Sequence, residues 1–438
     1  MTNLKVIVAC GLLLICLSSC ARQMKRETAT SEPTASSEPT ARSLPRPVRI
    51  SAEGQDAAEP ALASGGDGSA YVAWVEHRQN KEADVMLSHL GTDGQALGAP
   101  VRVNPKAGEA TAWRGDAPTV VVAPDKTIYV GWTARVASVE RANDLYLSVS
   151  RDGGQTFELP TKVNDDGRAV GHGMHSLAVG VDGRVYVAWL DERNAKGQMA
   201  MGEGGGAMQK MEHMESNREV FMAYSTDGGR SFSKNQRIAQ EACPCCKTAL
   251  AAGANGRVYA GWRQVLPGEF RHIAIAASED SGKTFSAPRI VSDDRWMIAA
   301  CPVSGPALSV ADDGALRVVW YTEGERAAPG LYRAESRDDG KTFPDVSLLV
   351  KGEGRGTPLL VAGGKNGASV VWESNEGGEP RVVSVPLKED EKNIDATPLA
   401  SSGELPSAAV SGDQLFIGYI AKANERRSIW IVRAKPVV

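Results

Sequence analysis

From about residue 47 onward, short apolar runs alternate with polar turn sequences at a regular spacing. The most regular runs end in an aromatic residue and occupy residues 71–74, 129–132, 186–189, 259–262, 317–320, 369–372 and 416–419. Most of them follow a Gly-containing turn and an earlier strand of small residues, a pattern typical of β-hairpins. Further strands at residues 144–148 and 160–163 are typical of the third and fourth strands of each unit. The pattern therefore predicts an all-β array of four-stranded units that recur every roughly 50 to 60 residues.

The two ends of this array complement each other. Residues 47–50 have the form of a fourth strand but follow no other strands, whereas the last unit, residues 407–432, lacks a fourth strand. An array that closes into a ring leaves no strand edge exposed, so we expect the N-terminal segment to complete the last unit. We predict a β-propeller of four-stranded blades, with seven blades favoured and six as the alternative.

The segment before the array has the composition of a leader and a tether. Residues 6–17 form an apolar run after Lys5 that is too short to span a bilayer and fits a signal peptide. The run ends at Leu17-Ser18-Ser19-Cys20, which resembles a bacterial lipobox with Cys20 as the acylated residue. We assign residues 1–19 to a signal peptide, 20–46 to a disordered Ser/Thr/Pro-rich tether and 47–438 to the propeller. A plain secretory signal is the alternative.

Localisation and partners follow from this leader and from the charge. Ala21 after Cys20 favours the outer membrane, so we expect a lipid-anchored protein of the cell envelope that faces the periplasm or the cell surface. The formal net charge is −4, and no basic patch with interleaved aromatic residues occurs, so we expect no nucleic-acid partner. Besides the membrane, the expected partner is a small ligand, a glycan or an envelope protein.

Four third strands run into one shared eight-residue sequence. Its copies occupy residues 150–157, 225–232, 278–285 and 336–343, with the acidic position at Asp152, Asp227, Asp280 and Asp338. An Asp in a tight turn accepts backbone N–H groups, a Gly supplies positive φ, and the final Phe anchors the turn. The four copies resemble the Asp box of the sialidase-like BNR-repeat propellers. The resemblance implies a propeller fold in which these boxes are structural.

The resemblance also implies a catalytic pattern from which this chain departs. Sialidases are expected to use three arginines, a tyrosine nucleophile and an Asp acid/base; the candidates on the expected face are Asp116, Tyr321, Arg263 and Arg355. The family's hallmark arginine lies two residues before the proline of a first strand, and this chain has no arginine at the equivalent positions, which hold Ala58, Asp116, Gly173, Cys246, Ser304, Gly356 and Glu404. We therefore expect binding rather than hydrolysis. An exo-sialidase-like glycosidase that acts on envelope or host glycans is the alternative.

Alignment of the repeats brings sulfur and imidazole groups to one mouth of the expected channel. Residues just before the first strands should converge there, and in three neighbouring blades they include soft or imidazole ligands: Cys243, Cys245, Cys246, Cys301, His172, Met174 and His175. A long Met-rich loop of the same blade as His172 contains Met211, His213 and Met214. Such ligands suit Cu(I) first and Zn second. The sequence predicts a metal site, with copper as the candidate cofactor.

Disulfides are the competing interpretation of the same cysteines. An oxidising envelope favours them, and Cys243 with Cys301, at equivalent positions of adjacent blades, forms the expected pair. His175 could be satisfied by backbone groups, and the Met-rich loop could be merely flexible. Both interpretations stay open at this point.

Overall fold

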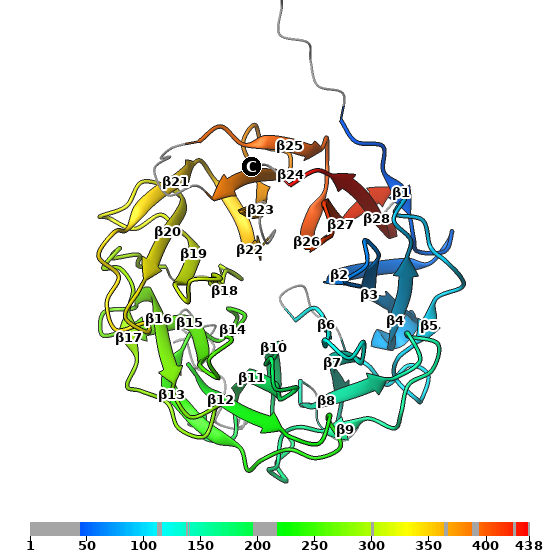
Figure 1. Ribbon diagram of the computed structural model, residues 1–438, viewed down its shortest axis with the longest axis horizontal. Coiled ribbons are helices and arrows are strands. Elements are labelled where there is room, and N and C mark those ends of the chain that lie inside the picture. The colour runs from blue at the N-terminus through cyan, green and yellow to red at the C-terminus, as the bar shows by residue number, and fades with distance from the viewer. Residues whose placement is uncertain are drawn as a thin grey trace, which may run out of the picture. The chain divides into compact units, whose positions relative to one another are not determined.

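The β-strands of the described residues form seven groups of four around a common centre (Figure 1). The strands are β1 (Val48–Arg49), β2 (Asp56–Ser64), β3 (Ala70–His77), β4 (Ala83–Leu90), β5 (Val101–Arg102), β6 (Thr119–Val122), β7 (Ile128–Arg135), β8 (Asn143–Ser150), β9 (Thr161–Lys162), β10 (His172–Val179), β11 (Val185–Asp191), β12 (Arg218–Ser225), β13 (Gln236–Ala242), β14 (Ala249–Ala252), β15 (Val258–Leu266), β16 (Phe270–Ser278), β17 (Arg289–Ile290), β18 (Ala307–Val310), β19 (Leu316–Thr322), β20 (Gly330–Ser336), β21 (Ser347–Lys351), β22 (Gly354–Ala362), β23 (Ala368–Ser374), β24 (Arg381–Leu387), β25 (Thr397–Ala400), β26 (Glu404–Ser411), β27 (Gln414–Ala423) and β28 (Arg426–Ala434). A single turn of 3₁₀ helix, η1 (Gln79–Lys81), lies between β3 and β4. The predicted all-β propeller with seven four-stranded blades is confirmed.

Each blade runs outward from the centre as a meander of antiparallel strands. The first strands β2, β6, β10, β14, β18, β22 and β26 lie nearest the centre (Figure 1), and each contacts the first strands of the two neighbouring blades. Blades 3 and 4 are also joined edge to edge, because Ala242 at the end of β13 pairs with Gln264 of β15. The fourth strand of blade 3 is thus longer than those of blades 1, 2 and 4, and it runs directly into the cysteine segment.

The ring is closed by the N-terminal segment, as the sequence predicts. Val48 and Arg49 of β1 pair with Ile431 and Trp430 of β28. Beyond the strand, the Ile50 N–H donates to the Ile429 carbonyl oxygen at 2.9 Å. β1 therefore serves as the fourth strand of the blade formed by β26, β27 and β28. The edge of β28 is paired with β1 and is not exposed.

The core lies between neighbouring blades rather than within one blade. Six of the repeated aromatic residues are tryptophans with at most 2 % of their surface exposed: Trp74, Trp132, Trp189, Trp262, Trp320 and Trp372. Because both faces of a blade are covered by neighbours, the second strands are buried on both faces and read as continuous apolar runs. Clusters of buried side chains span every pair of adjacent blades, including the last and the first.

The four Asp boxes form the turns that their sequences indicate. In the first box, Asp152 accepts the backbone N–H groups of Gln155 and Thr156, each at 3.0 Å. The N–H of Gly154, at φ +88°, donates to the Ser150 hydroxyl at 2.9 Å. The same bonds recur around Asp227, Asp280 and Asp338. Hydrogen bonds to the charged form hold the pKa of Asp152, Asp227 and Asp280 at about 2.

The structure describes residues 44–111, 116–136, 139, 141–195, 217–298, 302–362, 367–387, 394–423 and 426–436. The expected signal peptide, the acylated Cys20 and all but the last residues of the tether lie outside these ranges. So do Cys301, Met211, His213 and Met214. Within the described ranges, no helix is long and apolar enough to cross a bilayer.

Candidate functional site

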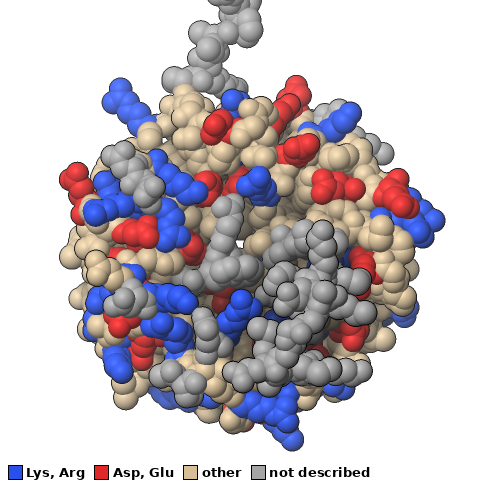
Figure 2. All heavy atoms as spheres, turned by 180° about the vertical axis from the view of Figure 1, so that it is seen from behind, with Lys and Arg blue, Asp and Glu red and all other residues tan. Residues whose placement is uncertain are grey.

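The first strands surround a central cavity of about 310 Å³. Its wall is largely apolar, with prolines at the starts of five blades: Pro60, Pro118, Pro306, Pro358 and Pro406. Lys247 and Glu59 are the charged residues of this wall. On the face shown in Figure 2, acidic and basic side chains are interspersed around the ring.

Bulges interrupt four of the first strands. In β2, β10, β22 and β26, the register of pairing with the second strand of the blade shifts within the first strand. Residues inside the bulges take positive φ without being glycine, for example Glu59 at 53°, Met174 at 55° and Leu405 at 47°. Such φ values are unfavourable for L-residues, so the rest of the fold must hold them in place. A bulge reverses the simple alternation of side chains along a strand.

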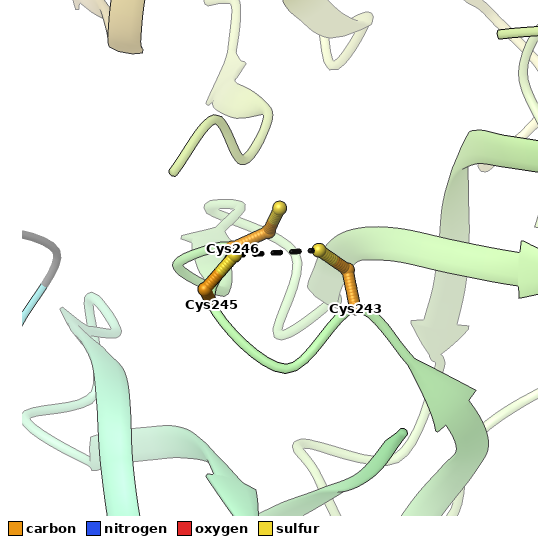
Figure 3. A group of neighbouring side chains, drawn as sticks. All are labelled: Cys243, Cys245 and Cys246. Carbon is orange, nitrogen blue, oxygen red and sulfur yellow. Dashed lines mark hydrogen bonds between the residues drawn. The ribbon is translucent and has the colours of Figure 1, made fainter. Parts of the chain in front are cut away.

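Three cysteines gather at the junction of blades 3 and 4. They follow β13 directly, and the Cys243 N–H donates to the Arg263 carbonyl oxygen at 2.8 Å, which continues the pairing of β13 with β15. The sulfur atoms of Cys243, Cys245 and Cys246 all lie within 4.8 Å of one another. All three side chains are buried, and Figure 3 shows the sulfurs of Cys243 and Cys245 directed toward each other, 3.9 Å apart.

The cysteine that forms a disulfide is not the one that the sequence led us to expect. Cys243 and Cys246 carry free thiols, whereas Cys245 is disulfide-bonded, and its partner lies outside the described residues. The expected pair of Cys243 with Cys301 is therefore wrong. Cys243 is instead held on the β13–β15 edge, and its sulfur accepts a hydrogen bond from Arg271.

Two buried arginines give the cluster a positive environment. Arg271 Nη1 donates to Cys243 Sγ at 3.2 Å. Arg263 is fully buried, and its guanidinium donates to the carbonyl oxygens of Ser304 at 2.7 Å and Tyr321 at 2.8 Å. Hydrogen bonding from Cys246, the Cys245 backbone N–H and the two guanidinium charges lower the pKa of Cys243 to about 6. Burial raises the pKa of Cys246, so one thiol of the pair is acidic and the other is not.

The three predicted metal ligands of strand β10 lie in three different surroundings. Met174 lies in the same buried cluster as the three cysteines. His172 instead has Nδ1 2.7 Å from the Asn143 carbonyl oxygen and Nε2 2.9 Å from Asp166 Oδ1. Among the described residues, neither His172 nor His175 adds a ring nitrogen to the group of sulfurs. The bulge after Gly173 accounts for this divergence.

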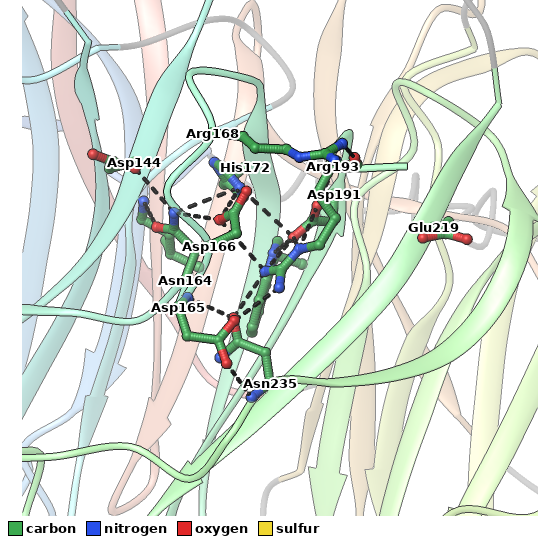
Figure 4. Close-up of polar contacts among 12 residues, drawn as sticks. Asp144, Asn164, Asp165, Asp166, Arg168, His172, Asp191, Arg193, Glu219 and Asn235 are labelled. Atoms are coloured by element: carbon green, nitrogen blue, oxygen red, sulfur yellow. Dashed lines mark hydrogen bonds and ion pairs between the residues drawn. The ribbon is translucent and has the colours of Figure 1, made fainter. Parts of the chain in front are cut away.

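His172 belongs to a buried polar network between blades 2 and 3 (Figure 4). Asn164 Nδ2 donates to Asp144 at 2.9 Å, and its Oδ1 accepts the Leu145 N–H at 2.9 Å. Asn104, at the equivalent position one blade earlier, makes the same two bonds to Asp84 and Val85. The Asn–Asp arrangement is a repeated element of blade structure, and His172 is attached to it through Asp166, which accepts a hydrogen bond from Asn164.

His175 pairs with Asp116 beside the cavity. His175 Nδ1 lies 3.2 Å from Asp116 Oδ1, and the Met174 N–H donates to the same oxygen at 2.6 Å. Burial opposes the charge of Asp116, but His175, Lys247 and this N–H lower its pKa. Lys247 Nζ donates to the Ala117 carbonyl oxygen at 2.8 Å, and burial lowers the pKa of Lys247 to about 8.

The side chains of the candidate glycosidase residues do not converge on one site. Arg263 is committed to backbone carbonyls, and Asp116 to His175. Tyr321 is buried and its hydroxyl donates to Glu323 at 3.1 Å; burial and this carboxylate raise its pKa. Arg355 is exposed and pairs in register with Glu373 on the neighbouring strand. The structure gives no arginine triad around Tyr321 in the described residues.

Sequence reasoning missed Lys247 and Arg271. Lys247 follows Cys246 directly, so the sequence alone places a basic residue next to the cysteine motif. Arg271 reaches Cys243 from the start of β16, 28 residues further along the chain. No pattern in the sequence marks this contact.

Comparison with known proteins agrees with this fold. A search of curated proteins gives no match. A protein of unknown function from Dyadobacter fermentans is 13 % identical, with a TM-score of 0.50 over 90 % of this chain and 99 % of that chain. The polysaccharide lyase Uly1 is also 13 % identical, with a TM-score of 0.50 over 83 % and 88 % of the two chains. A Hadza microbial sialidase is 17 % identical, with a TM-score of 0.45 over 84 % and 76 %.

At these identities the similarity to solved structures concerns the fold alone. The family is shown by the sequence model for the BNR repeat-like domain, which matches residues 68–391. This range runs from the first blade into the sixth and includes all four Asp boxes. The chain belongs to the family of the BNR repeat-like domain.

Proposed function

We propose that this protein is a lipid-anchored β-propeller of the cell envelope that binds a soft metal ion, Cu(I) in the first place, through Cys243, Cys245 and Cys246. The observation that supports this proposal is the meeting of three buried sulfur atoms within 4.8 Å of one another. Thiolates are the protein ligands that select Cu(I), with Zn as the next candidate.

The surroundings of the sulfurs favour ligands of the thiolate and thioether type. A metal needs deprotonated cysteines, and the pKa of Cys243 is already lowered to about 6. The thioether of Met174, in the same buried cluster, is a further soft ligand. The two histidines of β10 are engaged in other contacts, so the proposed donor set consists of sulfur.

Metal binding requires reduction of the disulfide at Cys245, since a sulfur in a disulfide is not a thiolate ligand. The oxidised protein offers two thiols, and the reduced protein offers three. We therefore expect tight Cu(I) binding only after reduction.

The test is a Cu(I) competition against a chromogenic chelator without oxygen, on full-length protein before and after reduction. We expect about one Cu(I) per reduced chain, as is typical of one cluster of soft ligands. Cys243→Ser and Cys246→Ser should each weaken binding, and Met174→Leu should weaken it less. Met222→Leu is the matched control, because Met222 is also buried but lies in another cluster.

The proposal fails if reduced wild-type protein binds Cu(I) no more tightly than reduced Cys243→Ser. The same measurement with Zn shows whether the cluster discriminates between the two ions. Preference for Zn would exclude copper as the cognate metal and would keep the sulfur site.

A further inference from the structure

The repeated tryptophans differ in what their indole N–H groups contact. In four blades the Nε1–H donates to a side-chain oxygen, in the pairs Trp132–Ser148, Trp189–Asp191, Trp262–Gln264 and Trp320–Asp294. The Nε1–H groups of Trp74 in blade 1 and Trp372 in blade 6 have no partner among the described residues. Both side chains are buried. A buried donor without an acceptor is unfavourable, so each of these N–H groups marks a place where an acceptor would stabilise the protein.

Trp372 differs from Trp74 because it borders a cavity. This cavity of about 240 Å³ is lined by residues of β21, β23, β24 and β25, where the fourth strand of blade 5 lies beside blade 6 (Figure 1). Trp372 is part of the wall, whereas Trp74 is not. Pockets for drug-sized molecules have volumes of about 300–1,000 Å³, so this cavity suits a smaller molecule.

Blade 3 shows which group completes the same arrangement. The Trp189 Nε1–H donates to Asp191, two positions further along the strand, at 2.7 Å. Arg193 Nε lies 3.0 Å from both oxygens of this carboxylate. In blade 6 the residue two positions after the tryptophan is Ser374, whose hydroxyl accepts the Glu376 N–H at 3.4 Å. Ser374 also lines the cavity, so the place of the missing carboxylate opens into the cavity.

Two cations border the cavity. Arg381 pairs in register with Ser374 on the neighbouring strand, and Lys351 ends β21; both side chains belong to the wall. Among the described residues, neither side chain forms an ion pair. Blade 6 therefore repeats the indole N–H and the guanidinium of blade 3, but the carboxylate between them is absent from β23.

The packing around Trp372 holds its indole ring in place. The ring of Tyr321 lies 5.9 Å from it between centroids. Gly354 packs so closely that a Cβ at this position would lie 1.6 Å from Trp372 Cζ2. A donor that is already fixed in position loses little entropy when an acceptor binds, which favours binding.

We propose that this cavity binds a small monocarboxylate, whose carboxylate accepts the Trp372 N–H and pairs with Arg381. The ligand carboxylate takes the place that Asp191 fills in blade 3. This site is separate from the cysteine cluster and needs no metal. It also lies at the edge of the ring, between two blades, and not in the central cavity.

The rest of the wall limits the ligand further. Val350, Val383 and Ile394 supply apolar surface, which suits a short hydrocarbon chain. Glu376 and Asp395 also line the cavity, so a second negative charge on the ligand would be repelled. A short-chain monocarboxylate fits these features better than a multiply charged anion such as phosphate.

The experiment measures the affinity of the full-length protein for butyrate. Butyrate is titrated in a buffer without carboxylate or phosphate, and binding is followed by ligand-observed NMR. Butyramide is the neutral probe of the same shape, and inorganic phosphate is the competing anion. We expect butyrate to bind at least about tenfold more tightly than either, because hydrogen bonds to a charged group are the stronger ones.

Variants assign the contacts. Trp372→Phe should weaken butyrate binding about tenfold, the effect of losing one hydrogen bond to a charged group. Trp74→Phe is the matched control, since it removes an unpartnered N–H outside the cavity, and it should bind butyrate like wild type. Arg381→Gln should also weaken binding about tenfold. Arg289→Gln, at an exposed arginine of β17 outside the cavity, should leave it unchanged.

Ser374→Asp tests the comparison with blade 3 directly and does not depend on the folding of Trp372→Phe. It places a carboxylate two positions after the tryptophan, as at Asp191, so the chain supplies its own acceptor. We expect Ser374→Asp to abolish butyrate binding without a loss of thermal stability. Ser374→Ala is the matched control and should still bind butyrate.

The proposal is overturned if wild-type protein binds butyrate no more tightly than butyramide or inorganic phosphate. It is also overturned if Ser374→Asp binds butyrate like wild type, or if Trp372→Phe and Trp74→Phe have equal effects. None of these results bears on the copper measurement, because the two sites share no residue.

Discussion

The repeated tryptophans provide a test of how buried hydrogen bonds stabilise this fold. Trp189 and Trp74 occupy equivalent places in two blades, and both are fully buried. The Trp189 Nε1–H donates to the buried carboxylate of Asp191 at 2.7 Å. The Trp74 Nε1–H has no partner among the described residues. Replacement of each by Phe removes the same atoms but a different interaction.

The expected difference follows from these contacts. Both Trp→Phe changes leave a similar void, which costs about 1–2 kcal/mol. Trp189→Phe also loses a hydrogen bond to a charged group, worth about 2 kcal/mol, whereas Trp74→Phe removes an unsatisfied buried donor, which returns about 1 kcal/mol. We expect Trp189→Phe to destabilise the protein by about 3 kcal/mol more than Trp74→Phe.

Equilibrium unfolding in urea measures both variants against wild type under oxidising conditions that keep the Cys245 disulfide. The loss of stability in Trp132→Phe should lie between those of the other two variants, because the Trp132 Nε1–H donates to the neutral hydroxyl of Ser148 at 2.9 Å. The slope of free energy against urea should stay constant across the series. Equal losses for Trp74→Phe and Trp189→Phe would refute the reasoning.

Three further predictions concern closure, charge and anchoring. Deletion of residues 47–51 should lower the free energy of unfolding by about 3–4 kcal/mol, because the pairing of β1 with β28 and the bonds of Ile50 and Ser51 to Ile429 are lost; deletion of five tether residues, 31–35, is the matched control and should have no effect. The pKa of Lys247 is lowered from its ordinary value of 10.5 to about 8 in the folded protein. Between these two pH values, Lys247 is protonated in the unfolded chain but largely deprotonated in the folded protein. Over that window wild type should gain stability with rising pH relative to Lys247→Met, measured by urea unfolding at each pH, and a constant difference would contradict it. Cys20→Ser should release the protein from membranes, and a variant that stays in the membrane fraction after a high-salt wash would disprove lipid anchoring.

Most of the fold could be predicted because its signals are local and repeated. The turn chemistry of the Asp boxes depends on residues within a few positions of each other, as the bonds of Asp152 to Gln155 and Thr156 illustrate. The seven blades and the closing strand follow from the same repetition, since residues 47–50 have the form of a fourth strand.

The site could be predicted only where its members are neighbours in the sequence. Cys243, Cys245 and Cys246 meet because they share one turn. The strand β10 gave a wrong expectation of convergence for its histidines, because the bulge at Met174 changes which side of the strand each residue faces. Arg271 approaches from another strand, and such long-range contacts depend on how the strands pair.

The pairing of β13 with β15 has a consequence for the motions of the protein. Separate blades of a repeat protein can open independently, but blades 3 and 4 share one hydrogen-bonded sheet through Ala242 and Gln264. Amide hydrogens of both blades should therefore exchange with solvent in a single cooperative opening event. The cysteine segment begins at the next residue after Ala242. A change in the chemical state of this segment should therefore alter the opening of all eight strands of the shared sheet.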